Sequence, residues 1–411
     1  MNKNIIVWSL YDFANSIVMI VFLLYFSQWL VVDIGKPDWW YNLTLILSSV
    51  MFILTAPLLA RRLDISGAKL KGVRIFSSLI AVCYVGTALS MLYLSAIPVF
   101  AVVFFTLAMY MYLISFIYYT PMLNDLCHEG NRGWISGLGH GANYLGSVFG
   151  LLVTLPFATG AIYLFGAPGR AQTLLPAVAL FIIFALPLLI SYKSPRAIPS
   201  PTTNGLAGGY KDVWETTKRI FSIRNLAFLF LGYFLFSDAL LTFSNNFPIF
   251  LEKVFLISDD VKAYLMAGIL TLSAVGAVVM GKVADKKGSR KTLMAILLLW
   301  FIIFPVIAFA PTFKMAAVIM VFAGFFFGPV WAISRAMVSE YAPREIEASS
   351  FGFYIVAERF ATFIGPIVWS IVLAGTASQG TISYSYAIVS MGILILISFF
   401  CVKKIKPVFG L

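Results

Sequence analysis

Two aspartates lie inside long apolar stretches at corresponding places in the two halves of the sequence. Asp12 lies in the first stretch, and Asp238 lies in the seventh, 226 positions later. An ionisable side chain in the hydrocarbon core of a membrane costs roughly 3 kcal/mol on insertion scales. A carboxylate at such a position binds a substrate amine or a coupling proton, or it caps or staples its helix. We expect Asp12 and Asp238 to bind substrate or protons.

Other polar residues accompany both aspartates. Tyr11 and Asn15 flank the first one, and Thr242 and Asn245 follow the second at i+4 and i+7. Residues with this spacing share one face of a helix. We therefore expect Asn15 and Asn245 to line the same binding site as the aspartates, and Tyr11, one of the abundant aromatic residues of the spans, is a further candidate for it.

Further polar or charged side chains lie within apolar stretches. Glu358 and Arg359 are adjacent, so they point about 100° apart on a helix and cannot face one partner. One of them binds substrate or a coupling ion, or forms an interhelical salt bridge. His140 is either a proton relay or a structural hydrogen-bonding group, and Asn143 is a further candidate for the site. Arg335 either contacts a substrate carboxylate, pairs with a nearby acid, or extends to lipid phosphate.

The segment 281–291 reads Gly-Lys-Val-Ala-Asp-Lys-Lys-Gly-Ser-Arg-Lys. Gly281 allows two helices to approach closely, and Gly288 allows a tight turn. Asp285 can accept hydrogen bonds from the N-terminus of a neighbouring helix or pair with a base. Together with Arg290, such a cluster can hold the cytoplasmic helix ends in one state and release them in the other. We expect a gate here.

A weaker copy of this segment occurs in the first half, at residues 60–67. Ala60 replaces the first glycine, and Ile65 follows Asp64 where a base is expected. Asp64 is therefore a weaker gating candidate. Asp64 and Asp285 lie 221 positions apart, close to the 226 positions between Asp12 and Asp238. The similar offset of the two pairs indicates two related halves.

Composition fixes the class of protein. Of 411 residues, 61% are hydrophobic and 11% are charged, against about 25% charged in soluble domains. So few charges cannot cover a water-facing surface, which excludes a soluble enzyme. The net charge of +12 comes mainly from bases at the ends of apolar segments, which indicates membrane orientation rather than binding of nucleic acid.

Since about 20 apolar residues cross a bilayer, the hydropathy predicts twelve spans in an all-α membrane protein. Their approximate ranges are 5–32, 41–60, 73–94, 97–120, 136–158, 173–192, 226–249, 263–282, 291–311, 315–337, 350–374 and 383–402. With both termini placed in the cytoplasm, 22 Lys/Arg lie inside and five outside. This asymmetry predicts cytoplasmic termini.

The longest connection divides the spans six and six. We expect an N-terminal six-helix bundle over residues 1–192 and a C-terminal one over 226–411. The cytoplasmic linker 193–225 is expected to contain a short amphipathic helix near 210–219 that contacts membrane lipids.

The segment 281–291 fits the signature of the major facilitator superfamily at every fixed position. The opening Trp8-Ser-Leu-Tyr-Asp-Phe-Ala-Asn-Ser resembles that of its vacuole effluxer branch, the autophagy-related permeases and their prokaryotic relatives. Further motifs of the chain resemble that branch in the same order: 136–139 and 144–146, 233–238, 334–335, 351–354, and 365–366. The resemblance implies a twelve-helix secondary transporter of the major facilitator fold, with amino-acid efflux as the best-known activity.

We therefore expect a secondary transporter that works by alternating access on amino acids or similar small metabolites, with protons as a possible coupling ion. The alternatives are efflux or flipping of amphipathic drugs or lipids, and a non-transporting membrane sensor on the same scaffold. The sequence has no metal-ligand cluster, P-loop or nucleophile–base pair, so we expect no metal, no cofactor and no enzymatic activity. We expect a monomer in a prokaryotic plasma membrane.

Overall fold

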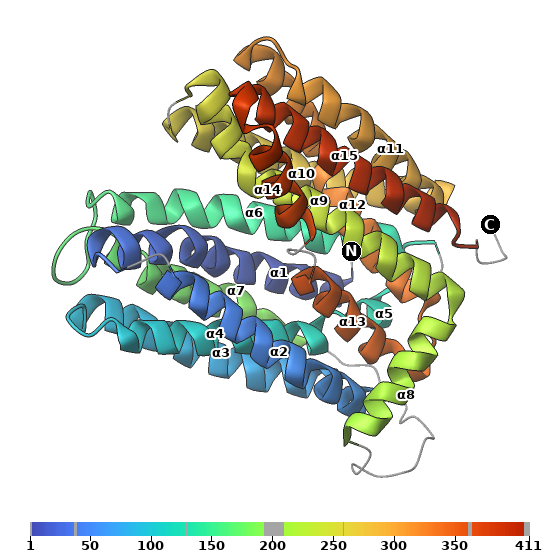
Figure 1. The fold of residues 1–411 in the computed structure, drawn as a ribbon. Helices are drawn as coiled ribbons and strands as arrows, with labels where there is room; N and C mark the ends of the chain where they lie inside the picture. Colours follow the sequence, from blue (N-terminus) through green and yellow to red (C-terminus); the bar gives the residue numbers. More distant parts are fainter. Residues whose placement is uncertain are drawn as a thin grey trace. The chain divides into compact units, whose positions relative to one another are not determined.

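The computed structural model describes residues 2–36, 39–128, 130–192, 209–257, 259–360 and 364–406. Within these ranges all regular secondary structure is helical. Eleven of the described helical segments are long and apolar enough to cross a membrane, and Ile364–Gly375 is a shorter apolar helix. Figure 1 shows the order of the helices along the chain.

Six predicted spans precede the long connection. They correspond to α1 (Lys3–Val21) with the π-helical segments Phe22–Phe26 and Trp29–Asp33, α2 (Trp39–Ser66), α3 (Lys69–Tyr93), α4 (Val99–Tyr119) with the short α5 (Met122–Leu126), α6 (Arg132–Ala158), and α7 (Leu174–Ser191). A 3-10 turn, Arg170–Gln172, precedes α7.

The helices after the connection are α8 (Gly209–Ser222), α9 (Arg224–Phe255), α10 (Asp259–Lys287), α11 (Ser289–Ala308), α12 (Phe313–Tyr341), α13 (Glu347–Phe360), α14 (Ile364–Gly375) and α15 (Ile382–Lys403). Two 3-10 turns, Arg344–Ile346 and Ala377–Gln379, precede α13 and α15. The predicted spans are confirmed, and the majority of their ends agree with the helix ends to within a few residues. The predicted eleventh span, 350–374, corresponds to α13 and α14, with residues 361–363 outside the described part.

The chain divides into two compact units. Unit 1 contains residues 1–126 and 142–213, and unit 2 contains residues 127–141 and 214–411. The first ten residues of α6 therefore belong to unit 2 and the rest of that helix to unit 1. The division into bundles 1–192 and 226–411 stays a prediction.

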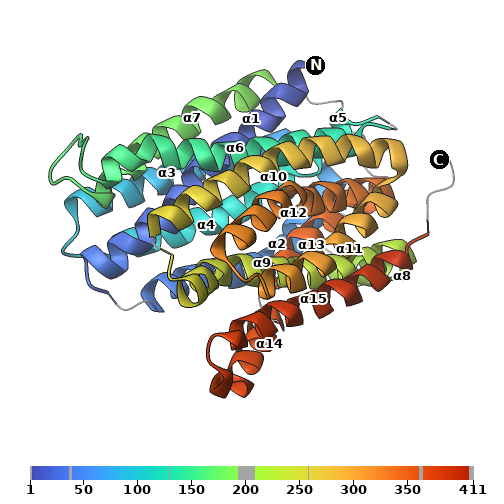
Figure 2. The same cartoon turned by 90° about the horizontal axis from the view of Figure 1, so that it is seen from above.

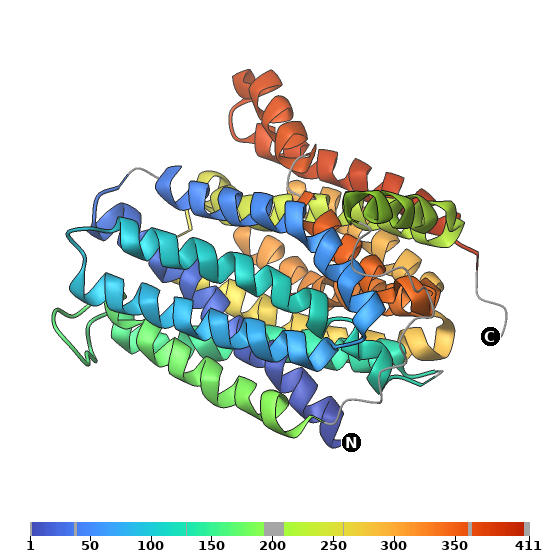
Figure 3. The same ribbon diagram turned by 90° about the horizontal axis from the view of Figure 1, so that it is seen from below.

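In unit 1, α4 packs against α3 and α2, and α7 packs against α1 and α3. Figure 3 shows α3 and α4 running side by side. Buried side chains between these helices are large and aromatic, among them Phe22, Tyr84 and Phe105. The ring of Phe22 lies 4.7 Å from Tyr84 and 5.0 Å from Phe105, centroid to centroid. This aromatic cluster forms the core of unit 1.

In unit 2, α10 packs against α12, and α15 contacts α9, α11 and α14. Figure 2 shows α14 lying beside α15. α9 additionally contacts α12, α13 and α14, so the seventh span touches both helices of the eleventh. This placement brings the polar residues of α9 next to those of α12, α13 and α14.

Local sequence explains several helix ends. Gly288, between α10 and α11, has φ of +91°, a conformation that side chains with a Cβ rarely adopt. The hydroxyl of Thr312 accepts a hydrogen bond from the N–H of Met315 and caps α12. α4 ends at Tyr119 and α5 begins at Met122, on either side of the Thr120-Pro121 pair. The proline thus marks the change of direction expected for a helix interrupted at this residue.

Many large apolar side chains on the spans are exposed, including Ile190 (69%), Val318 (70%) and Ile371 (65%). A protein in water rarely exposes so much apolar surface. These side chains are suited to contact lipid tails, which fits the multi-pass membrane protein that the composition predicts.

Candidate transport and gating sites

The candidates of the first span are buried in unit 1. Tyr11 and Asn15 are fully buried and Asp12 is 2% exposed. The hydroxyls of Tyr11 and Ser77 are hydrogen-bonded at 2.7 Å, and the Asn15 amide donates to the carbonyl of Tyr11 at 2.8 Å. α1 therefore presents a carboxylate, an amide and a phenol within two turns.

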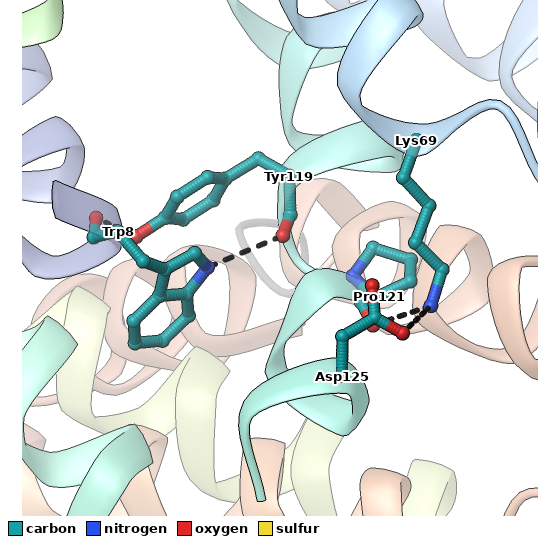
Figure 4. A network of polar contacts seen from close by, with 5 residues as sticks. All are labelled: Trp8, Lys69, Tyr119, Pro121 and Asp125. Atoms are coloured by element: carbon teal, nitrogen blue, oxygen red, sulfur yellow. Dashed lines mark hydrogen bonds and ion pairs between the residues drawn. The ribbon is translucent and has the colours of Figure 1, made fainter. Parts of the chain in front are cut away.

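Trp8 and Tyr119 fasten α1 to the end of α4 (Figure 4). Their rings stack at 5.1 Å with an interplanar angle of 12°. Each side chain also bonds the backbone of the other: the Tyr119 hydroxyl donates to the Trp8 carbonyl at 2.8 Å, and the Trp8 indole donates to the Tyr119 carbonyl at 3.4 Å. The pair anchors the helix that carries Asp12.

A salt bridge lies at the kink between α4 and α5 (Figure 4). The Lys69 ammonium is 2.9 Å from the Asp125 carboxylate and donates to the Pro121 carbonyl at 3.0 Å. Lys69 begins α3, directly after the weaker copy of the gating segment. Asp64 of that copy is half-buried near the end of α2. Lys69 thus makes an ion pair with Asp125 in this region.

The gating segment in unit 2 binds the N-terminus of α6. The two carboxylate oxygens of Asp285 accept hydrogen bonds from the backbone N–H groups of Gly133 at 2.7 Å and Trp134 at 2.8 Å. These N–H groups belong to the first turn of α6 and have no partner within the helix. A carboxylate there also interacts favourably with the helix dipole.

Small residues allow this contact. A Cβ on Gly281 would lie less than 3.0 Å from the carbonyl oxygen of Gly133, and a Cβ on Gly137 would overlap the carbonyl of Ala277. The ammonium of Lys282 lies over the Trp134 ring, 5.3 Å from its centroid. α6 and α10 therefore cross in backbone-to-backbone contact.

Arg290 contacts a different partner. Its guanidinium donates to the carbonyl of Lys403 at 2.6 Å and to that of Val402 at 3.4 Å. Because these carbonyls end α15, the cation lies where the helix dipole is negative. The segment 281–291 thus binds the N-terminus of one helix and the C-terminus of another.

Arg335 is 3% exposed and lies on α12. Its guanidinium donates to the hydroxyl of Ser136 at 3.0 Å and to the carbonyl of the same residue at 2.8 Å. The Ser136 hydroxyl in turn donates to the carbonyl of Ala332 at 2.6 Å. His140 lies one turn further along α6, with a buried Nδ1 that has no hydrogen-bond partner among the described residues. Asn143 lies in the part of α6 that belongs to unit 1.

Glu358 is held by a pair of stacked tyrosines. The Tyr233 hydroxyl donates to the Glu358 carboxylate at 2.9 Å, and the rings of Tyr233 and Tyr354 lie 4.2 Å apart. The Tyr354 hydroxyl is 3.3 Å from that of Ser334 and donates to the Trp331 carbonyl at 3.2 Å. The side chain of Arg359 lies outside the described residues.

Asp238 is fully buried and contacts the start of α14. One carboxylate oxygen accepts a hydrogen bond from the backbone N–H of Gly365 at 2.6 Å. Thr242, one turn later, is buried beside it, whereas Asn245 is exposed. The expected polar stripe therefore divides, with Asp238 and Thr242 inside the unit and Asn245 outside.

Four partners in unit 2 had no role assigned from the sequence: Ser136, Tyr233, Tyr354 and Gly365. All four lie in the short motifs that carry the resemblance to the effluxer branch. The structure joins these motifs in pairs, the fifth span with the tenth, the seventh with the eleventh, and the tenth with the eleventh. The shared order of these motifs is the sequence feature that could have singled out the four residues. It does not indicate which of them touch.

A family model described as "Vacuole effluxer Atg22 like" matches residues 127–406, which include every contact just described for unit 2. The chain belongs to the vacuole effluxer Atg22-like family. A relative along nearly the full length is the MFS-type transporter YxiO of Bacillus subtilis, 22% identical over 95% of this chain and 93% of that protein. Autophagy-related protein 22 of Kluyveromyces lactis is 21% identical over 48% of this chain and 41% of its own length.

Solved structures establish the fold of this Atg22-like protein. The human organic anion transporter MFSD10 matches with a TM-score of 0.77 and 15% identity, over 97% of this chain and 99% of its own. The major facilitator transporter FucP, in an outward conformation, matches with a TM-score of 0.77 and 12% identity, over 99% and 98%. The major facilitator fold is thereby confirmed. Relatives and neighbours are transporters rather than enzymes, in agreement with the sequence.

Proposed function

We propose that this transporter carries amino acids or similar small zwitterions by alternating access and couples their movement to protons. The observation that supports the substrate class most strongly is the pair of opposite charges around two buried tyrosines in unit 2. Glu358 is bonded to Tyr233, whose ring stacks on that of Tyr354, and the Tyr354 hydroxyl contacts that of Ser334, the residue before Arg335.

This arrangement suits a ligand with two charges of its own. A carboxylate has about four lone-pair sites and a guanidinium has five N–H donors. Tyr233 and Ser136 hold the carboxylate and the guanidinium in fixed orientations, as a binding site for a charged ligand requires. In the proposed complex, Glu358 binds a substrate ammonium and Arg335 binds a substrate carboxylate. The tyrosine rings add an apolar and π-rich surface for the rest of the molecule.

Family membership supports the same class. The matching family is described as vacuole effluxers, and the resemblance of the chain's motifs to that family implies amino-acid efflux. Proton coupling is supported by Asp12 and Asp238, two buried carboxylates on the first spans of the two halves. Among structures with the same fold are a fucose:proton symporter and a proton:xylose symporter.

In the proposed cycle, two six-helix bundles, 1–192 and 226–411, move about a shared site, with both termini in the cytoplasm. The hydrogen bonds of Asp285 to α6 form in one state and break in the other, so Gly281, Gly288 and Arg290 belong to the gate. Bacterial relatives support a prokaryotic plasma membrane as the location. The functional unit in this proposal is the monomer.

The proposal is tested with purified protein in proteoliposomes. Uptake of radiolabelled zwitterionic amino acids is compared with uptake of a sugar, an organic anion and an apolar cation, with and without an inward pH gradient. We expect accumulation of the amino acids alone, increased by the gradient. Transport of the organic anion or the apolar cation with no amino-acid uptake would replace this proposal with efflux of amphipathic compounds.

A further inference from the structure

Asp238 uses only one of its two carboxylate oxygens within unit 2. Oδ2 accepts the hydrogen bond from the backbone N–H of Gly365, and the N–H of Ile364 faces the same carboxylate. Oδ1 is buried and has no hydrogen-bond partner among the described residues. The hydroxyl oxygen of Thr242 is buried beside this carboxylate and has no other hydrogen-bond partner among the described residues. Unsatisfied buried polar atoms cost about 1–3 kcal/mol each, so two neighbouring ones call for an explanation.

The two unpartnered atoms face the same point. A Cβ on Gly365 would stand 2.9 Å from Oδ1 of Asp238 and would overlap Oγ1 of Thr242. α9 and α14 therefore meet at a distance that only glycine permits at this position. The approach brings the acid, the hydroxyl and the first turn of α14 together.

No cation compensates the charge of Asp238 within the described part of unit 2. On α12, which packs against α9, the guanidinium of Arg335 is bonded to Ser136. On α13, Glu358 is bonded to Tyr233 and is itself an acid. α14 has no charged residue, and α15 has only Lys403, at its far end, with Tyr384 and Tyr386 as further titratable groups. Among the described residues, the groups that stabilise the ionised carboxylate are the N–H groups of Gly365 and Ile364 and the hydroxyl of Thr242.

We propose that Oδ1 of Asp238 is the binding site of one exchangeable proton, and that α14 responds to its occupancy. The proton forms an O–H bond on Oδ1 that donates to Oγ1 of Thr242, whereas in the ionised state the Thr242 hydroxyl is the donor and the carboxylate accepts. Oδ2 still accepts from Gly365, but as a neutral acceptor. Charge-assisted hydrogen bonds are about twice as strong as neutral ones, and the favourable interaction with the helix dipole is also lost.

Proton binding therefore loosens the first turn of α14, and proton release tightens it. This rests on the proton coupling proposed above and adds the structural element that responds to the proton. α14 is the second helix of the eleventh span, whose first helix carries Glu358. The proton site and the proposed ammonium site thus lie on the two helices of one span.

Hydrogen–deuterium exchange tests this without any substrate. The protein in lipid nanodiscs is labelled between pH 5 and 9, and protection of the amides of Ile364, Gly365 and Ile367 is expressed relative to their intrinsic rates. In the wild type we expect protection to fall about three- to tenfold as the pH is lowered, which corresponds to the loss of a charge-assisted cap. Protection in the middle of α11 serves as an internal reference and should not change.

Two variants separate titration from capping. Asn does not titrate and accepts hydrogen bonds as a neutral group, so Asp238→Asn should show the reduced, low-pH level of wild-type protection at every pH. Asp238→Ala, which has no acceptor, should show still lower protection at every pH. Ser237→Ala, on the adjacent residue, should retain the pH dependence of the wild type. Melting temperatures and size-exclusion profiles establish that each variant is folded.

Wild-type protection that does not vary with pH, or pH dependence that persists in Asp238→Asn, would overturn the proton site. The outcome is independent of transport. A pH-dependent α14 without proton-driven uptake would contradict the proposed coupling and leave this site standing. Proton-driven uptake together with a pH-independent α14 would support the proposed coupling and contradict the proton site on Asp238.

Discussion

Asp285 binds the first turn of α6 through Gly133, whose backbone N–H lies 2.7 Å from one carboxylate oxygen, with the N–H of Trp134 at 2.8 Å from the other. The two partners lie about 150 residues apart in the sequence. The carboxylate thus supplies two hydrogen bonds to a helix end that has no internal partners for them. In the proposed transport cycle this contact is the gate.

Replacing Asp285 with Ala should weaken the gate and the fold together. Loss of a side-chain cap costs about 1–2 kcal/mol, since the N–H groups of α6 lose their acceptor and the dipole loses its counter-charge. We expect a lower melting temperature and a transport rate reduced at least tenfold. Lys314→Gln changes an exposed charge at the start of α12, outside the gating segment, and should leave both unaltered. Equal behaviour of the two variants would contradict a gating role for Asp285.

Gly281→Ala should be destabilising because the new methyl group would lie less than 3.0 Å from the Gly133 carbonyl. Overpacking of this kind typically costs about 1–3 kcal/mol. Gly268 provides the matched control, since it lies on the same helix with nothing within 4 Å of the position of its Cβ. Gly268→Ala should be neutral or stabilising by up to about 1 kcal/mol. Melting temperatures in detergent measure both, and a neutral Gly281→Ala would show that α6 and α10 are not in close contact.

Tyr233→Phe should impair substrate binding while leaving the tyrosine stack in place. The ring retains its contact with Tyr354, but the Glu358 carboxylate loses the hydrogen bond that orients it. We expect KM for zwitterionic substrates to rise about tenfold, in line with a hydrogen bond to a charged group worth roughly 1.5 kcal/mol.

Glu358→Gln should reduce transport more severely, because it removes the proposed counter-charge of the ammonium. Glu345→Gln, an exposed acid before α13, is the control and should transport normally. If both Tyr233→Phe and Glu358→Gln kept the kinetics of the wild type, the proposed ammonium site would be wrong.

Tyr119→Phe tests the contact between α1 and α4 in unit 1. The substitution removes the hydroxyl that donates to the Trp8 carbonyl but preserves the stacked rings. We expect the free energy of unfolding to fall by about 1 kcal/mol, since the buried Trp8 carbonyl loses the hydrogen bond that it accepts from the Tyr119 hydroxyl. Tyr93→Phe, on an exposed tyrosine at the end of α3, should have no effect on the melting temperature. An unchanged melting temperature for Tyr119→Phe would show that this hydrogen bond does not contribute.

The sequence was sufficient for the number and positions of the spans, because apolar runs of about 20 residues separated by charges leave little ambiguity. The eleventh span is different: its polar Glu358-Arg359 pair lies inside an apolar run, and the structure describes α13 and α14 on either side of residues 361–363, which lie outside the described part. The pattern of residues 281–291 indicated that Asp285 could bind a helix N-terminus. It contained no information on which helix, because that depends on packing between distant segments.

The partners of Asp238 and Glu358 show the same limit. A buried aspartate indicates a cost that something must offset, but hydropathy does not reveal that Gly365 and Tyr233 supply the hydrogen bonds. Asn245 was grouped with Asp238 because of helical spacing alone, and the structure leaves it exposed. Helical periodicity fixes which residues share a face, whereas burial depends on where neighbouring helices end.

Coupling of zwitterion transport to a proton on Asp238 is tested most directly by two transport modes, measured in parallel on the same proteoliposomes. Counterflow exchanges labelled for unlabelled amino acid and needs no net proton movement, whereas accumulation driven by a pH gradient does. We predict that the wild type performs both and that Asp238→Asn retains counterflow but loses accumulation. Full gradient-driven accumulation by Asp238→Asn, or absence of amino-acid counterflow in the folded wild type, would contradict the account.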